Sequence, residues 1–213
     1  MSQNSVSSPK HCAKQGRLVN INNKLYKKLL FTFSTLLTSV ASLILIVWMT
    51  LHPSKPEFSV KEVGVYQLKL SDPDLLNSSI ELSLLSENPN QKVGIYYQDL
   101  QLFATYKDQQ ITVSASLPSF YQGHQDSNLL SASLIGNGLP VSPMFKYEVG
   151  RDQTAGTLTL SLKVNGKVRW KVGTWVSGTY RIFVSCTAVL EFCPGNPAGP
   201  WNSKQGSHCS TSV

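Results

Sequence analysis

The sequence lacks the short motifs that identify common catalytic centres. It contains no Gly-x-Ser-x-Gly, His-Glu-x-x-His or Gly-x-x-x-x-Gly-Lys motif. Its four histidines form no closely spaced His/Cys pattern of the metal-binding kind: they are His11, His52, His124 and His208. The carboxylates Glu81 and Glu87 lie near the ends of one expected strand, where solvated side chains are the simpler interpretation. The sequence therefore predicts no enzyme, no cofactor and no metal site.

Acidic residues are absent from the first 51 residues, and this absence indicates the topology of the chain. Six Lys and Arg residues precede residue 29, and no charged residue lies between Leu29 and Leu51. A helix over these 23 residues would be about 34 Å long, and the hydrocarbon core of a bilayer is about 30 Å thick. Because Lys and Arg beside a span remain cytoplasmic, the sequence predicts a transmembrane helix over 29–51 with a cytoplasmic N-terminus.

The basic residues before the span indicate topology and not nucleic-acid binding. The formal net charge of +7 is concentrated there, because the residues after the span hold 13 Lys/Arg against 12 Asp/Glu. A cleaved signal peptide would have a shorter apolar core and a small-x-small site, which this segment does not have. Residues 1–28 contain few large apolar side chains, so we expect a disordered, basic cytoplasmic tail and a span that anchors the chain in the lipid bilayer.

Residues 57–192 show the short alternating segments of an all-β domain, separated from the span by a Pro-containing stalk over 52–56. Gly, Pro and Asn separate several alternating runs, and no segment after residue 52 has the apolar spacing of a helix of ten or more residues. Asn165-Gly166 predicts a type I′ hairpin between strands over 158–164 and 168–172. These signals predict a β-sandwich, followed by an irregular tail over 193–213.

Three cysteines lie in the part of the chain that we expect outside the cell: Cys186, Cys193 and Cys209. An oxidising compartment permits disulfides, and an odd number leaves one cysteine free or paired with another chain. Cys193–Cys209 would close the Pro/Gly-rich loop, and Cys186–Cys193 would fix the last strand. A third interpretation leaves all three reduced, with Cys186 in the core.

Two further sets of residues are candidates for modification or binding. The tripeptide Asn77-Ser78-Ser79 is a glycosylation sequon, which we expect in a turn with glycan on Asn77. Seven aromatic residues are candidates for a ligand groove, although their alternating spacing favours core and cross-strand packing. They are Tyr96, Tyr97, Tyr106, Phe120, Tyr121, Trp170 and Trp175.

Several short motifs follow one another in a specific order. After the basic tail, the span and the stalk come Ile80-Glu81-Leu82-Ser83-Leu84, Asn88-Pro89-Asn90, Ile95-Tyr96-Tyr97, Asp99-Leu100, the segment 117–124, the segment 168–173, and the segment 180–186. Over about residues 20–190 this order resembles the plant late-embryogenesis-abundant type 2 (LEA-2, or water stress and hypersensitive response domain) family. More narrowly, it is similar to the membrane-anchored NDR/HIN-like (harpin-induced-like) branch. The Cys/Pro/Gly-rich extension after Phe192 departs from the family pattern.

The resemblance implies an immunoglobulin/fibronectin III-like β-sandwich outside the plasma membrane, with roles in plant defence, the hypersensitive response and abiotic stress and with no known catalytic centre. We therefore expect a membrane-tethered protein that binds protein partners or a second copy of itself. A membrane-tethered lipid-binding or lipid-transfer module is the alternative, motivated by tethering close to a bilayer. The Asn88-Pro89-Asn90 segment is interpreted as a structural turn, because Pro fixes φ and Asn tolerates left-handed backbone.

Overall fold

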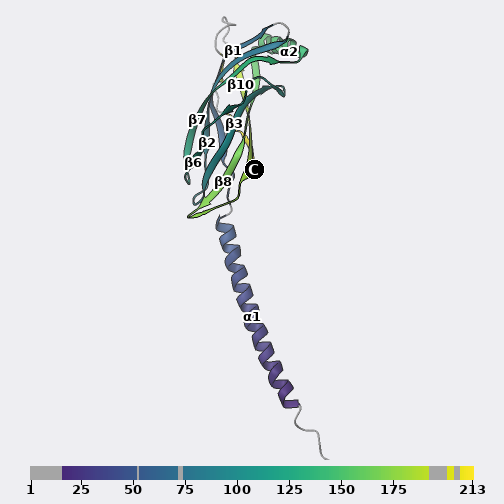
Figure 1. Ribbon diagram of the computed structural model, residues 1–213, viewed down its shortest axis with the longest axis vertical. Coiled ribbons are helices and arrows are strands. Elements are labelled where there is room, and N and C mark those ends of the chain that lie inside the picture. Colours follow the sequence, from purple (N-terminus) through teal and green to yellow (C-terminus); the bar gives the residue numbers. More distant parts are fainter. Residues whose placement is uncertain (1–15, 52, 72–73, 192–200, 204–206) are drawn as a thin grey trace, which may run out of the picture. The chain divides into compact units, whose positions relative to one another are not determined.

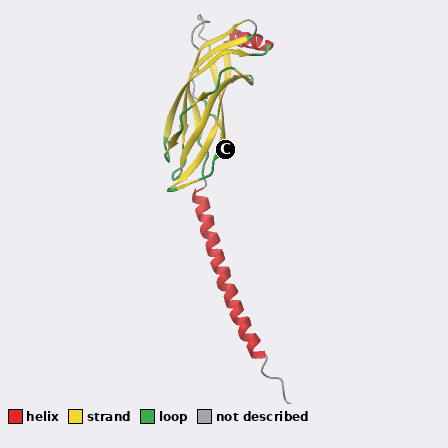
Figure 2. Ribbon diagram, viewed as in Figure 1, coloured by secondary structure: helices red, strands yellow, loops and turns green. Residues whose placement is uncertain are grey.

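A computed structural model describes residues 16–51, 53–71, 74–191, 201–203 and 207–213 (Figures 1 and 2). The chain divides into two compact units, Met1–His52 and Pro53–Val213. In chain order the elements are α1 (Gly16–Leu51), β1 (Glu57–Ser71), β2 (Leu75–Glu87), β3 (Gly94–Tyr106), β4 (Gln109–Gln110), β5 (Ala115–Ser116), β6 (Phe120–Gln122), β7 (Ser127–Pro140), α2 (Pro143–Ala155), β8 (Thr157–Val172), β9 (Trp175–Val176), β10 (Tyr180–Glu191), β11 (Trp201–Ser203) and β12 (Ser210–Ser212).

The first unit contains helix α1, whose section Asn23–Trp48 is long and apolar enough to cross a membrane. The helix begins at Gly16, so the prediction of a disordered tail over 1–28 is wrong for residues 16–28; residues 1–15 lie outside the described part of the chain. Extending an existing helix fixes one residue for each new hydrogen bond, whereas starting one is costly. The apolar helix therefore extends into the polar sequence before it.

Hydroxyl side chains within α1 are satisfied by the helix itself. The Oγ1 of Thr32 donates to the carbonyl of Leu29 at 3.0 Å, and the Oγ of Ser42 donates to the carbonyl of Ser39 at 2.8 Å. Such bonds to the preceding turn remove the need for water. A helix that carries Ser and Thr in this way remains compatible with a hydrocarbon environment, where an unsatisfied polar group costs several kcal/mol.

The second unit confirms the predicted β-sandwich. The strand order is β4-β3-β8-β10-β11-β1-β2-β7, and every pairing is antiparallel. β3, β8 and β10 form one layer, β1, β2 and β7 form the other, and β11 joins them by pairing with both β10 and β1. The rings of Phe58 on β1 and Tyr97 on β3 meet edge to face, with centroids 6.2 Å apart. The two layers therefore share one core.

Strict alternation in the sequence fills this core. In β10 the buried residues are Ile182, Val184, Cys186, Ala188 and Leu190, and the residues between them are exposed. Successive side chains of a strand point to opposite faces, so a period of two places every apolar residue of such a run inside. Each fully buried aliphatic side chain contributes about 1.5–3 kcal/mol, which makes this alternation the main source of stability.

The predicted hairpin at Asn165-Gly166 is wrong. Both residues lie inside the continuous strand β8, where Asn165 pairs with Phe183 of β10 and Gln101 of β3. A β-bulge in β3 lies opposite, with Asp99 at φ 51°. A Cβ on Gly166 would lie 2.5 Å from the side chain of Leu100, so this glycine is required by close packing and not by a turn. The hairpin instead forms at Gly173, which has φ 57° and precedes β9.

Helix α2 contradicts the prediction that no helix of ten residues follows residue 52. It has 13 residues, begins with a proline and ends at Gly156, which adopts a left-handed φ of 80°. Among its residues only Phe145 and Val149 are buried. Two residues form too short an apolar stripe for a helical period to be visible in the sequence. Phe145 packs edge to face on Tyr106 at 5.5 Å, and the Tyr106 hydroxyl donates to the Asp152 carboxylate at 2.6 Å. The helix therefore docks on the far end of β3.

Candidate functional site

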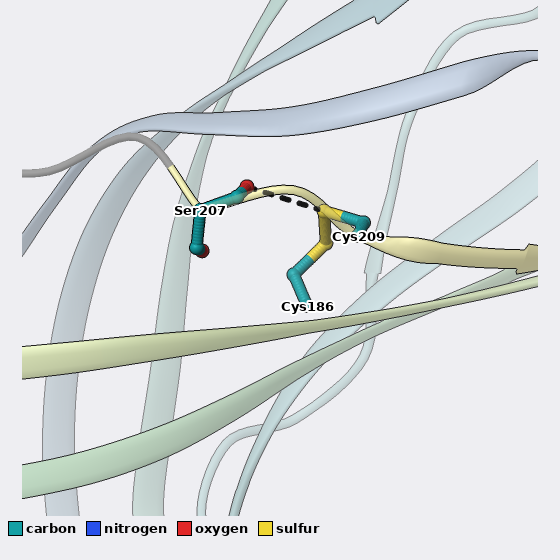
Figure 3. Close-up of a disulfide and its surroundings, with 3 residues drawn as sticks. All are labelled: Cys186, Ser207 and Cys209. Carbon is teal, nitrogen blue, oxygen red and sulfur yellow. Dashed lines mark hydrogen bonds between the residues drawn. A yellow bond between two sulfur atoms is a disulfide. The ribbon is translucent and has the colours of Figure 1, made fainter.

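One disulfide joins Cys186 of β10 to Cys209, which directly precedes β12 (Figure 3). The S–S distance is 1.99 Å and the Cα atoms lie 4.2 Å apart. Both pairings proposed from the sequence involve Cys193 and are therefore wrong for Cys186 and Cys209; Cys193 itself lies outside the described residues. Figure 3 also marks the Cys209 sulfur 4.0 Å from the Ser207 carbonyl, which is a contact only, because a disulfide sulfur carries no proton to donate.

The segment around Cys209 lies between the two layers of the sandwich. The Cys209 amide donates to the Phe58 carbonyl at 3.0 Å, and the Val60 amide donates to the Ser207 carbonyl at 3.0 Å. β12 then pairs with β10, with Val184 opposite Thr211. The predicted irregular tail over 193–213 therefore contains two short strands, β11 and β12, because the free edges of β1 and β10 offer backbone partners that no local signal reveals.

The sequon residue Asn77 lies in β2 and not in a turn. Its Oδ1 accepts a hydrogen bond from the Gly138 amide at 2.8 Å. Its Nδ2 donates a solvent-exposed hydrogen bond to the Ser71 hydroxyl at 3.4 Å. The side chain is half-buried, and Ser79 lies on the same outward face of the strand. The Asn77 Nδ2 atom, which would carry a glycan, therefore makes one long hydrogen bond, to Ser71.

The seven aromatic candidates do not converge on one groove. Tyr97, Tyr106 and Trp170 are buried, and the Tyr97 hydroxyl donates to the Gln122 carboxamide at 2.9 Å. Burial raises the pKa of the Tyr97 phenol far above its ordinary value. Tyr121 lies outward, close to Tyr96. These arrangements follow the cross-strand and core packing that the alternation favours.

Lys171 lies over two of the outward aromatic rings. Its Nζ is 5.7 Å from the ring centre of Tyr96 and 5.1 Å from that of Tyr121, within the range of cation–π attraction. The Tyr121 ring also lies against Gly94, where a Cβ would clash with it. Trp175 is separate from this cluster and is 62% exposed on β9.

A hollow of about 490 Å³ lies on the outward face of β1, β2 and β7. Glu62, Tyr66 and Glu81 contribute its charged and aromatic groups, and serines and Gly64 contribute its floor. The negative charge of Glu81 is the largest cause that raises the pKa of the Tyr66 phenol, followed by burial, a hydrogen bond to Glu81 and the charge of Glu62. Two carboxylates, a phenol and several hydroxyl groups on an open surface are suited to binding a polar partner.

A second hollow, of about 580 Å³, lies on the outward face of the other layer beside the bulge in β3. Lys167 pairs with Asp99 here at 2.8 Å, and Arg181 and the exposed Phe183 complete the wall. In the described part of the chain, no group of three or more His, Cys, Asp or Glu side chains is placed to hold a metal ion. The sandwich therefore has a hollow on the outward face of each layer, mainly polar on the first and mixed polar and apolar on the second.

Asn88 holds together the loops at one end of the sandwich. Its Nδ2 donates to the carbonyls of Val93 at 2.8 Å and Gly123 at 2.7 Å. Its Oδ1 accepts from the backbone amide of Asn90 at 3.1 Å and from the Asn90 side chain at 2.8 Å. Two donors and two acceptor positions are the full capacity of a carboxamide, so this buried side chain is completely satisfied.

Asn90 extends this network to the stalk. Its Nδ2 donates to the Ser54 carbonyl at 2.9 Å, and its Oδ1 accepts from the Ser54 amide at 2.7 Å. The interpretation of Asn88-Pro89-Asn90 as a turn therefore misses its second role. Ser54 lies 36 residues earlier in the chain, and no local pattern in the sequence points to it. The stalk residues from Pro53 onwards thus belong to the β unit.

Comparison with known proteins identifies close relatives. The family model described as late embryogenesis abundant protein (LEA_2) matches residues 83–188. NDR1/HIN1-like protein 26 of Arabidopsis thaliana is 51% identical over 215 residues and covers 100% of both chains. NDR1/HIN1-like protein 12 of the same organism is 41% identical over 70% of each chain, and NDR1/HIN1-like protein 1 is 37% identical over 89% of each chain.

Proposed function

Because the chain belongs to the NDR1/HIN1-like branch of the late embryogenesis abundant family, we propose that it is a single-pass plasma-membrane protein with a non-catalytic β-sandwich outside the cell. In this proposal the sandwich acts in plant defence and stress responses by binding protein partners or a second copy of the chain. The two hollows on its outward faces support a binding role.

The observation that carries the proposal is the Cys186–Cys209 disulfide in the unit that follows α1. Disulfides persist in oxidising compartments and are rare in the cytosol. The six basic residues before the span independently favour a cytoplasmic N-terminus. Two unrelated physical properties, redox state and charge distribution, therefore support the same side of the membrane for the β unit.

A protease-protection experiment tests this topology. The full chain, with different tags at its two ends, is expressed in plant protoplasts and treated with protease before and after permeabilisation. We expect intact cells to lose the C-terminal tag and keep the N-terminal one. Protection of the C-terminal tag in intact cells would contradict the plasma-membrane location or the orientation.

Glycosidase treatment of the same material tests the sequon. We expect the mass of the wild-type chain to fall on deglycosylation and that of the Asn77→Gln variant to remain constant. This variant is a matched control because the substitution keeps an uncharged carboxamide at position 77 and removes the sequon. An equal shift in both chains would contradict glycosylation at Asn77.

Proximity labelling from the C-terminal tag tests the binding role. We expect recovery of extracellular proteins or of a second, differently tagged copy of the chain. Recovery of neither, together with normal pathogen and stress responses in plants that lack the protein, would contradict the proposal. The lipid-carrier alternative gains no support from the described residues, because large side chains such as Tyr97, Phe58 and Leu102 fill the space between the layers.

A further inference from the structure

We propose that the turn between β8 and β9 is a second contact with the bilayer, in which the indole of Trp175 lies in the headgroup layer. This inference rests on the proposed membrane anchor and adds a site to it. It assigns a lipid surface, and not a protein, as the partner of one end of the sandwich.

The turn lies at the end of the β unit where the chain enters from the span. Two hydrogen bonds hold Ser54 to Asn90. Four residues after Asn90, Gly94 begins β3 and pairs with Lys171 of β8. β8 runs on past this pair towards Val172, and Trp175 pairs with Val172 across the hairpin. Trp175 therefore lies beyond the first pair of β3, on the same side as the held stalk. Figure 1 shows α2 at the opposite end of the β unit.

The length of the connection keeps this end close to the membrane. Helix α1 ends at Leu51, and Ser54 follows it by three residues. A fully extended chain covers at most about 3.6 Å per residue, so three residues span about 11 Å. The headgroup layer occupies about 5–8 Å on each side of the hydrocarbon core. Because two hydrogen bonds hold Ser54 to Asn90, the connection allows this end of the β unit to reach the headgroup layer when the span is inserted.

The chemistry of the turn suits this position. Trp175 is 62% exposed, whereas Trp170 and Trp201 of the same unit are buried. An exposed indole combines a large apolar ring with one polar N–H, which is why tryptophan is enriched at membrane interfaces. Gly173, at φ 57°, forms the tight turn that carries this ring outward.

Charge does not account for the contact. The exposed or half-buried cations near this end are Lys55, Lys92, Arg169 and Lys171, against the anions Glu57, Glu87 and Asp126. The small excess of one positive charge gives little net attraction to anionic lipid. We therefore expect the contact to depend on the aromatic ring and to be insensitive to salt.

Site-specific photo-crosslinking tests the inference in the full chain. The photoreactive aromatic residue p-benzoylphenylalanine replaces Trp175 in protein reconstituted into phosphatidylcholine vesicles, and lipid adducts are measured by mass spectrometry. Tyr147 is the matched control, because it is 66% exposed on α2 at the opposite end. Ile44, which is 63% exposed within α1, is the control for the anchor. Non-reducing electrophoresis confirms that each variant retains the Cys186–Cys209 disulfide.

We expect lipid adducts at positions 175 and 44, several-fold above position 147, with the yield at position 175 unchanged by molar salt. Adducts at position 44 but not at 175, or protein adducts alone at 175, would overturn the inference and leave the anchor intact. A yield at position 175 that collapses in high salt would overturn the assignment to the aromatic ring. Absence of adducts at both 44 and 175 would overturn the membrane anchor itself.

Discussion

Replacing Asn88 with alanine should destabilise the sandwich more than any exposed polar substitution. The variant removes four hydrogen bonds, three of which are buried. It removes this partner from the Val93 carbonyl and from the Asn90 backbone amide in a buried environment, while the Asn90 side chain keeps its bonds to Ser54. A buried polar group left unsatisfied costs about 1–3 kcal/mol, so we expect a loss of about 4 kcal/mol in the free energy of unfolding. For a unit of this size that corresponds to a fall of about 8–16 °C in the melting temperature.

Thermal unfolding of the full chain in lipid nanodiscs, followed by near-ultraviolet circular dichroism, measures this change. Asn137→Ala is the matched control, because Asn137 is exposed in β7 and its loss should change stability by less than about 0.5 kcal/mol. Asn88→Asp tests the donors alone: it keeps the shape but places a carboxylate against two carbonyl oxygens, so it should be at least as destabilising. Equal melting temperatures for Asn88→Ala and Asn137→Ala would refute the reasoning.

Three further predictions follow from the same structure. Cys209→Ser should lower the free energy of unfolding by about 3.5 kcal/mol, from the chain entropy of a loop with a sequence separation of 23; denaturant titration measures it, and a larger loss in Cys193→Ser would contradict the pairing. Gly166→Ala should cost about 1–3 kcal/mol by the same titration, because its methyl group would lie 2.5 Å from a leucine carbon, and a neutral effect would refute the close packing. The hydrogen bond from Tyr106 lowers the pKa of Asp152, so this carboxylate stabilises the fold above its ordinary pKa and the stability is lost as pH falls through the folded value. Asp152→Asn should flatten the decline in stability below about pH 4, and an unchanged slope would contradict the prediction.

The sandwich was predictable because its strands are buried on one face only. In β10, and over most of β2, apolar and polar residues alternate, and a period of two is visible in the sequence itself. β7 gives no such signal, because Leu129 and Ile135 are exposed on its outward face while Leu134 is buried. With apolar residues on both faces, the alternation disappears and the strand is recognisable only by its pairing with β2.

The errors at Asn165-Gly166 and in the cysteine pairing have a common cause. Each depends on a contact between residues far apart in the sequence. Asn-Gly favours a turn locally, but pairing with β3 on one side and β10 on the other outweighs that preference. The cysteine pairing likewise depends on the segment before β12 lying beside β1, which the sequence does not encode in any short pattern. The hydrogen bond between Asn90 and Ser54, which lies 36 residues earlier in the chain, illustrates the same limit.

The position of Cys209 sets an order of events during biosynthesis. Cys186 is part of β10, and Cys193 precedes Cys209 by 16 residues in the chain. Both are therefore synthesised before Cys209. Until Cys209 is available, the cysteine downstream of Cys186 is the wrong partner. The nascent chain therefore reaches its native linkage either by keeping Cys186 reduced until β12 arrives or by thiol–disulfide exchange from a Cys193 intermediate, which makes the yield of folded protein sensitive to the oxidant and isomerase supply of the compartment.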